Sequence, residues 1–387
     1  MTTASHAAID PIPNQVDPPE ATSARNEIFP LATLDPACFS IVMATGIVAL
    51  ACWQLRGDLD GLAWVAKALS WTNGAIFLSL LLLSVLRIAR YPRNVLADFS
   101  DHSRAFGLFS TIAASCVLAS DLDHITAQSN LVVFLWWVGL VLWIAITYGV
   151  FAGITTAPRK PSLRDGLQGS WILAVVATQA VAVLTTSLSQ RLPTDPQSAL
   201  LLAQSLWLIG GMLYLVFISL IIYRYCFEPL DGVALTPPYW INMGAMAIST
   251  LAGTSLIFAA DTSPLLQQFL PFLKGATLLF WATATWWIPL LAVLGFWRHR
   301  SRGVPLNYDL RYWSMVFPLG MYSVATFEMY RWLSIDVFHT IARVFALLAL
   351  LAWIVTAIGL LKRCGVICAM VIDARAVKKV GNDTARK

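Results

Sequence analysis

The sequence predicts an all-α, polytopic membrane protein whose ten transmembrane helices form five helical hairpins around a central pore. Three observations support this fold class. Apolar residues make up 58% of the 387 residues, charged residues make up only 12%, and the basic residues gather in alternate loops. Soluble proteins average about 25% charged residues, so a chain this poor in charge predicts a protein embedded in lipid.

Ten apolar stretches are each long enough to cross a bilayer, because a transmembrane helix needs about 20 mainly apolar residues. They lie near residues 37–55, 64–88, 103–120, 130–152, 168–188, 199–223, 238–259, 272–297, 311–331 and 337–361. No soluble run between them is long enough to bury a core of its own. We therefore expect one transmembrane domain over residues 36–361.

Basic residues are concentrated in every second connection between the stretches. They are Arg87, Arg90, Arg93 and Arg104 after the second stretch, Arg159, Lys160 and Arg164 after the fourth, and Arg298, Arg300, Arg302 and Arg311 after the eighth. The connection after the third stretch starts with Asp121, Asp123 and His124 and holds no Lys or Arg. By the positive-inside rule, both termini are cytoplasmic and the number of spans is even.

The two ends of the chain are polar. Residues 1–35 contain Pro11, Pro13, Pro18 and Pro19 and lack the charged-then-apolar start of a secretory signal, so we expect a disordered cytoplasmic tail. Residues 362–387 form a basic cytoplasmic tail. The basic residues do not make one patch, so nucleic acid is not an expected partner. The expected partner is the lipid bilayer of the plasma or inner membrane.

The odd-numbered stretches share a pattern at their starts. Each begins with an aromatic residue at the cytoplasmic border and continues with small and hydroxylated residues, as in Phe39–Gly46, Trp240–Ala247 and Trp313–Gly320. Interfacial aromatics and small contact residues are common in membrane helices and offer one explanation. The other is a ring of five inner helices whose small side chains keep a central passage open, inside five Leu-rich outer helices.

Mild polar and small residues near the starts of the inner stretches are the candidate pore lining. They are Met43, Thr45, Gly46, Ser110, Thr178, Asn242, Gly244 and Ser314. Their polar groups either donate hydrogen bonds to a passing anion or bond their own helix backbone, and the pattern leaves both roles open.

Ionisable side chains inside the stretches are scarce, and such groups mark ion pathways or proton relays by default. Glu328 and Arg343, near the join of the last two stretches, are candidates for an ion pair or for proton coupling. Arg331 is an alternative partner for Glu328 at the i,i+3 spacing.

Phe317 and Pro318 lie midway down the ninth stretch. The proline removes a backbone hydrogen bond and kinks the helix. Phe317 beside this kink is either a ring that closes the pore as a hydrophobic gate or an ordinary packed core residue.

Residues 36–47, Asp101–Phe106 and Tyr312–Gly320 resemble the tellurite-resistance/dicarboxylate transporter family, which includes fungal malate permeases and sulfite efflux pumps and plant slow anion channels. The resemblance covers residues 36–361 and implies five hairpins around a pore, a homotrimer and a phenylalanine gate on the ninth helix that matches Phe317. The Met-Ala-Thr-Gly motif of the first stretch resembles the malate and sulfite members of this family more than the plant channels. The third stretch departs from the family pattern.

We therefore expect transmembrane transport of a small anion (malate or another C4-dicarboxylate, sulfite, tellurite or an inorganic anion) through a pore gated by Phe317. A proton-coupled carrier that uses Glu328 is the first alternative. A membrane-bound enzyme or electron carrier is the second, but the five histidines lie in the tail, loops or span ends and no hydrolase motif occurs. We expect no catalytic residue, no metal and no cofactor.

Overall fold

The computed structural model describes residues 31–126, 129–229, 235–305 and 307–384, with side chains up to Gly365 except at residues 126–129. Within these ranges every regular element is a helix, which confirms the all-α fold class. Most of the tail predicted over residues 1–35 falls outside the described residues.

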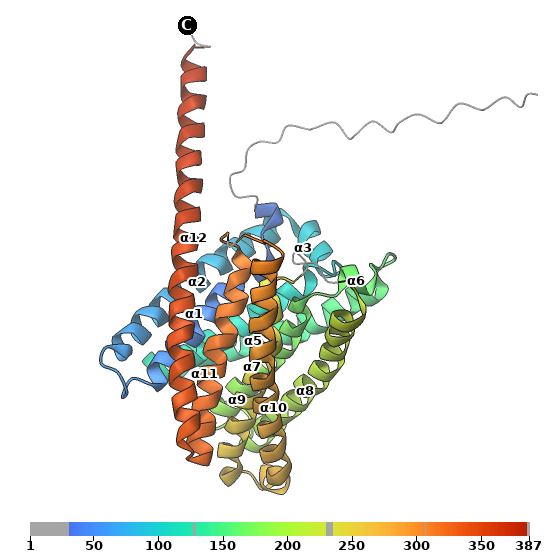
Figure 1. Cartoon of the computed structure of the whole chain (residues 1–387), viewed down its shortest axis with the longest axis vertical. Coiled ribbons are helices and arrows are strands. Elements are labelled where there is room, and N and C mark those ends of the chain that lie inside the picture. The colour runs from blue at the N-terminus through green and yellow to red at the C-terminus, as the bar shows by residue number, and fades with distance from the viewer. Residues whose placement is uncertain (1–30, 127–128, 230–234, 306, 385–387) are drawn as a thin grey trace, which may run out of the picture. The chain divides into compact units, whose positions relative to one another are not determined.

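Five inner helices form a closed ring, because each packs against the next and the last packs against the first. In ring order they are α1 (Ser40–Gln54), α4 (Phe109–Asp121), α7 (Leu173–Leu188), α9 (Ile241–Ala259) and α11 (Trp313–Leu333), shown in Figure 1. They correspond to the odd-numbered apolar stretches.

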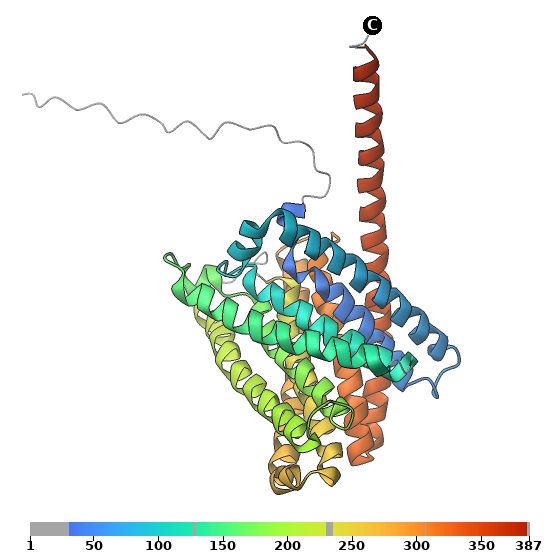
Figure 2. The same ribbon diagram turned by 180° about the vertical axis from the view of Figure 1, so that it is seen from behind.

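Five outer helices each pack against the inner helix that precedes them in the chain. They are α2 (Leu62–Arg90), α5 (Ser129–Thr156), α8 (Pro196–Phe227), α10 (Pro264–Phe296) and α12 (Asp336–Thr384). Figure 2 shows the α1–α2 and α4–α5 hairpins side by side from behind. The most apolar windows of the outer helices are 17 to 39% buried, against 78 to 83% for α1, α4, α7 and α9. The outer helices therefore form the lipid-facing surface.

Among the described residues, nine helices are long and apolar enough to cross a membrane, and α11 is not one of them. This helix has 21 residues but carries Pro318, Glu328 and Arg331. It packs against α1, α9 and α12, which shield it from lipid. The expected count of ten is therefore reached only when this enclosed, more polar helix is included.

Each inner helix starts with a 3₁₀ turn that contains an aromatic residue. The turns are η2 (Pro36–Phe39), η3 (Ala105–Leu108), η5 (Gly169–Ile172), η6 (Pro237–Trp240) and η9 (Leu310–Tyr312). At the first and last of them, the carboxylates of Asp35 and Asp309 accept hydrogen bonds from the backbone N–H two residues on. Such caps satisfy donors that a helix start leaves free. The aromatic repeat of the sequence thus marks a repeated local structure.

Shorter elements join the hairpins. They are η1 (Leu31–Thr33), α3 (Pro92–Asp98), η4 (Leu122–Thr126), α6 (Leu163–Gly166), η7 (Ala260–Thr262) and η8 (Trp297–Ser301). The last helix of the chain, α12, extends beyond the other helices of the bundle (Figure 1).

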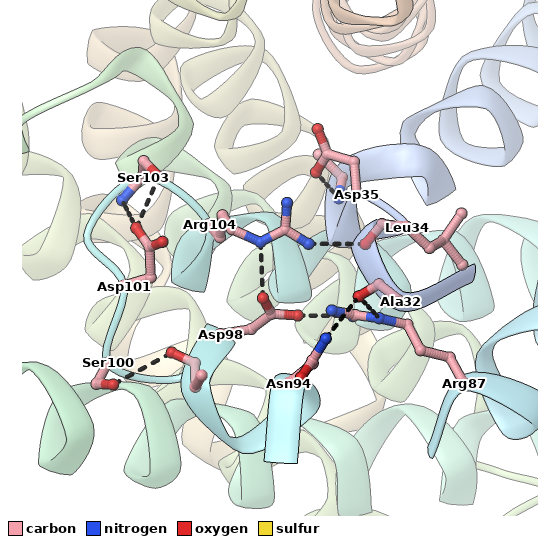
Figure 3. Close-up of polar contacts among 12 residues, drawn as sticks. Ala32, Leu34, Asp35, Arg87, Asn94, Asp98, Ser100, Asp101, Ser103 and Arg104 are labelled. Atoms are coloured by element: carbon pink, nitrogen blue, oxygen red, sulfur yellow. Dashed lines mark hydrogen bonds and ion pairs between the residues drawn. The ribbon is translucent and has the colours of Figure 1, made fainter. Parts of the chain in front are cut away.

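A charged cluster holds the first described residues against the bundle (Figure 3). Asp98 accepts hydrogen bonds from both Arg87 and Arg104, each at 2.6 Å. The same guanidinium groups donate to the backbone carbonyls of Ala32 and Leu34. Arg87 and Asp98 are buried, so this cluster fixes the segment that leads into α1.

We call the contact between the outer helix of one hairpin and the inner helix of the next a seam. A side chain of the outer helix donates a hydrogen bond across each of the five seams. The pairs are Asn73 to Asp121, Trp136 to Thr185, Trp207 to the carbonyl of Ser249, Trp281 to Thr326, and Trp353 to Thr45. Four seams use a tryptophan donor, and only the α2–α4 seam uses an ionisable acceptor.

Candidate transport passage

A cavity of about 380 Å³ lies inside the ring and is lined by residues from all five inner helices. It occupies the C-terminal halves of these helices. Under the orientation predicted from the basic loops, this half faces away from the cytoplasm. The cavity is therefore a candidate for the outer half of a passage along the ring axis.

The lining residues recur at the same spacing on every inner helix, at a first position and then three and seven residues further on. An apolar layer is formed by Ile47, Val117, Ala180, Ile248 and Met321. A middle layer is formed by Leu50, Ser120, Val183, Leu251 and Val324. A polar layer is formed by Gln54, His124, Ser187, Ser255 and Glu328. Steps of three and four residues keep side chains on one helix face, so the three layers are successive turns of one wall.

One cation stands beside the polar layer. Arg331 lines the cavity, its side chain is 56% exposed, and its guanidinium lies 5.2 Å from the centre of the Phe258 ring. It also donates to Glu328 at 2.8 Å. Arg331 is thus the exposed, positive member of an ion pair at the mouth, while the apolar and middle layers contain no charged side chain.

Glu328 has a partner for each carboxylate oxygen. Oε1 accepts from Gln54 and Oε2 accepts from Arg331, both at 2.8 Å. Of the two partners considered for Glu328, Arg343 lies on α12 in a separate groove beside Cys52 and Leu55 at the end of α1. The alternative partner, Arg331, sits one turn along the same helix.

Phe317 lies four residues before Met321, about one helical turn further toward the helix start. It is only 1% exposed and is not among the cavity-lining residues. By the spacing of the lining residues, the same level holds Met43, Ala113, Val176 and Gly244 on the other inner helices. The cavity thus ends just outside a closed level at which Phe317 is the largest side chain.

Pro318 next to Phe317 presses on α9. A Cβ built on Gly244 would lie 2.8 Å from Cγ of this proline, and real Cβ contacts are not that short. Gly320 is equally close to α1, since its Cβ would lie 2.9 Å from Ile47 Cγ2. These glycines allow neighbouring inner helices to touch. Their small size therefore narrows the ring and does not hold the passage open.

Three of the predicted lining residues use their hydroxyls in contacts with other elements. Thr45 accepts from Trp353 Nε1 at 3.0 Å, and Thr178 accepts from Trp143 Nε1 at 2.9 Å. Ser110 donates to the carbonyl of Pro36 at 3.0 Å. These hydroxyls join the inner helices to their surroundings.

The other predicted lining residues are also buried. Gly46 faces the α2–α4 seam, where its Cβ would meet Asn73 and Val117, and Gly244 faces Pro318. Met43, Asn242 and Ser314 are 5% exposed or less. None of the eight lines the cavity, because all lie in the closed N-terminal halves. Their role in the passage stays a prediction.

Sequence reasoning singled out Glu328 but missed the rest of the polar layer. Gln54, Ser187 and Ser255 are ordinary polar residues near the ends of apolar stretches, and nothing marks each of them alone. The usable signal was their common offset of seven residues from an apolar position on the same face of each inner helix.

A family model described as voltage-dependent anion channel matches residues 33–361. A sulfite efflux pump of Arthroderma otae is 24% identical over 366 residues, covering 89% of this chain and 95% of that protein. An uncharacterized transporter of Methanocaldococcus jannaschii is 24% identical over 334 residues, covering 85% and 94%. An uncharacterized membrane protein of Mycobacterium tuberculosis is 37% identical over 149 residues, covering 38% and 75%.

These matches confirm the resemblance drawn from the first and ninth stretches. Because the family model spans most of its length, the chain belongs to the voltage-dependent anion channel family.

Proposed function

We propose that the chain moves small anions across the membrane through the passage inside the ring, and that sulfite is the first substrate to test. The observation that carries this proposal is the cavity lined by equivalent residues of all five inner helices. The Arthroderma otae relative is named as a sulfite efflux pump, which supports sulfite. Malate and other C4-dicarboxylates, tellurite and inorganic anions belong in the same test.

The chemistry of the passage suits conduction. Arg331 at the mouth concentrates anions, and the apolar and middle layers offer them no fixed positive charge. Conduction requires binding that is favourable enough for entry and weak enough for exit. Mild hydrogen-bond donors in the wall, such as Ser120 and Ser187, meet both needs.

We assign the gate to Phe317. Its buried ring lies at the inner end of the cavity, where the opposite positions at Ala113 and Gly244 are small. An apolar constriction blocks ions because they cannot shed their hydration there. Rotation or displacement of one ring would open the passage without moving the packed helices.

Anion-replacement electrophysiology on Phe317→Ala tests the function and the gate together. We expect conductance to rise at least about tenfold, a lowering of the barrier by about 1.4 kcal/mol, and reversal potentials to follow the permeant anion. Phe327→Ala is the matched control, because Phe327 lies on the same helix but packs beside Tyr330 and His339. Unchanged currents in Phe317→Ala with normal surface expression would contradict the gate, and cation-selective currents would contradict anion transport.

A proton-coupled carrier that uses Glu328 is the weaker candidate. Both carboxylate oxygens of Glu328 are engaged by Gln54 and Arg331, which favours a structural ion pair that shapes the mouth. The matched relatives are named as channels, transporters or membrane proteins, so we propose transport and not catalysis as the activity.

We further propose a homotrimer in the plasma or inner membrane, with one passage in each protomer and both termini in the cytoplasm. The basic residues at the ends of α2 and α10 support this orientation. Cysteines introduced at positions 122 and 160 should label from opposite sides of the membrane, and the mass of the protein in nanodiscs should correspond to three chains. Same-side labelling would overturn the topology.

A further inference from the structure

Asp121 is a buried carboxyl group that the proposed passage does not use. It is the last residue of α4 and has no exposed surface. The sequence predicts Asp121 at the start of a connection, but α4 includes it as its last residue. Its neighbour Ser120 belongs to the middle layer, so Asp121 stands directly behind the wall of the passage.

The surroundings of Asp121 are built by three helices. Asn73 of α2 donates to Asp121 Oδ2 at 3.1 Å. Gly46 of α1 leaves the space for this bond, since a Cβ there would lie 2.6 Å from Asn73 Nδ2 and 3.1 Å from Asp121 Oδ2. Any other residue at position 46 would intrude on the pair.

Two oxygens of this pair have no hydrogen-bond partner. Both Asp121 Oδ1 and Asn73 Oδ1 are buried and accept no hydrogen bond, and the same holds for the hydroxyl of Ser70 one turn along α2. Buried polar atoms in native proteins are almost always paired. The two unfilled acceptors of this pair, Asp121 Oδ1 and Asn73 Oδ1, therefore indicate that a donor is missing.

No cation on the surrounding elements, as far as they are described, compensates a charge on Asp121. Helices α1, α4, α5 and α7 contain no basic residue. On α2, Lys67 lies over the ring of Trp64 and Arg87 pairs with Asp98 at the far end.

The next turn of chain, η4, offers no free charge either. Asp123 is bound to Arg191 and His124 Nδ1 contacts the carbonyl of Ser120. An ionised carboxyl in such a place is costly.

A proton on Asp121 removes the uncompensated charge. The neutral acid still accepts the Asn73 amide hydrogen at Oδ2, and its hydroxyl at Oδ1 supplies a donor to a pair that has only unfilled acceptors. The four remaining seams are held by neutral tryptophan donors on neutral acceptors. A protonated Asp121 makes the fifth seam neutral as well.

We propose that Asp121, with Asn73, is a proton-binding site in the wall of the passage and that anion flux requires this proton. The inference rests on the proposed function. When Asp121 loses this proton, its carboxylate places a negative charge directly behind the wall of the passage, and this charge repels the anion. Flux therefore falls as pH rises from neutral to alkaline.

Anion flux in proteoliposomes, measured at neutral and alkaline pH, tests the effect on transport. Wild-type flux should fall about tenfold at alkaline pH, the order expected for a unit charge in an adjacent layer at an effective dielectric constant of about 20. Asp121→Asn imitates the neutral acid, so its flux should stay constant across the same range. Glu328→Gln removes the other buried carboxyl of this half and should retain the wild-type pH response.

Infrared spectroscopy tests the proton directly and does not depend on transport. A carboxylic acid C=O band that shifts in D₂O should be present at neutral pH in wild type and in Glu328→Gln, and absent in Asp121→Asn. Should Asp121→Asn fail to fold, Asn73→Ala keeps the carboxyl, removes its partner and should move the band.

Three results would overturn the proton site: no such band in wild type, the same pH response in Asp121→Asn, or flux that follows sodium at constant pH. A wild-type chain that carries no anion would instead contradict the proposed function. The infrared band would still decide the state of Asp121.

Discussion

The two halves of the inner ring differ in how closely the same five helices approach one another. In the C-terminal halves the helices surround a cavity of about 380 Å³. In the N-terminal halves, glycines at positions 244 and 320 press against a neighbouring helix, and the 3₁₀ turns add aromatic bulk. One set of helices thus makes an open vestibule and a closed segment, and the boundary lies between Met321 and Phe317.

Close packing of the N-terminal halves of the inner helices keeps this narrow segment shut without a charge barrier. Small residues at a helix contact bring backbones together and leave little space between them. The open half instead carries branched and long residues at the lining positions, such as Leu50, Val183 and Leu251. Residue size at the helix contacts, more than polarity of the lining, separates the two halves.

The largest expected effect is a difference in cysteine reactivity along α1. In a background without the native cysteines, Leu50→Cys should react with a membrane-impermeant thiol reagent added outside. Met43→Cys, seven residues earlier on the same face, should react about a hundredfold more slowly, because it is exposed only through a rare opening that costs ~3 kcal/mol.

Adding Phe317→Ala should bring the rate at Met43→Cys close to that at Leu50→Cys. Equal rates in the protein with Phe317 intact would show that the closed half is not closed, and the comparison would fail. No change on adding Phe317→Ala would move the block to another residue.

The second effect is on stability. Gly244→Val should destabilise the bundle by about 1–3 kcal/mol, because its new carbons collide with the ring of Pro318. Gly275→Val on α10 is the control, since nothing lies within 4 Å of a Cβ at that position. Thermal unfolding in detergent measures both. Equal melting temperatures would mean that close packing does not hold the N-terminal halves together.

A smaller effect is expected at the mouth. Arg331→Gln should lower anion flux about two- to fivefold. The loss should shrink as ionic strength rises, because salt screens the attraction between an exposed charge and the anion. Glu328→Gln should leave flux nearly unchanged. A strong loss in Glu328→Gln together with lost pH dependence would instead favour proton coupling at Glu328.

Most of the fold could be predicted from the sequence, because length and apolarity alone define a helix that lies against lipid. The stretch at 311–331 was predicted as well, although α11 is less apolar, because it lies among other helices and therefore tolerates Pro318, Glu328 and Arg331. The sequence left Arg343 and Arg331 open as partners of Glu328, because it does not show which face of α12 meets α11.

The candidate passage was less predictable. Residues such as Thr45 and Thr178 look like a pore lining because they are small and polar, yet their hydroxyls accept bonds from tryptophans of other hairpins. Which face of a buried helix points to the centre depends on contacts on all its sides. Asp121 shows the same limit, since α4 ends one residue later than the predicted stretch and Gly46 leaves the space beside it.

The smallest expected effect tests whether the seams differ between the two halves. Trp353 donates to Thr45 in the closed half, and Trp136 donates to Thr185 in the open half, at 3.0 and 2.8 Å. Double-mutant cycles with Trp→Phe and Thr→Val at each pair should give similar coupling energies of about 0.6 kcal/mol, the usual size for side-chain hydrogen bonds in membrane proteins.

Similar values would locate the difference between the halves in the glycine contacts of the inner ring, since the outer helices would then hold both halves equally. A coupling several times larger at Trp353–Thr45 would instead mean that the outer helices clamp the closed half shut, and opening would require that clamp to break.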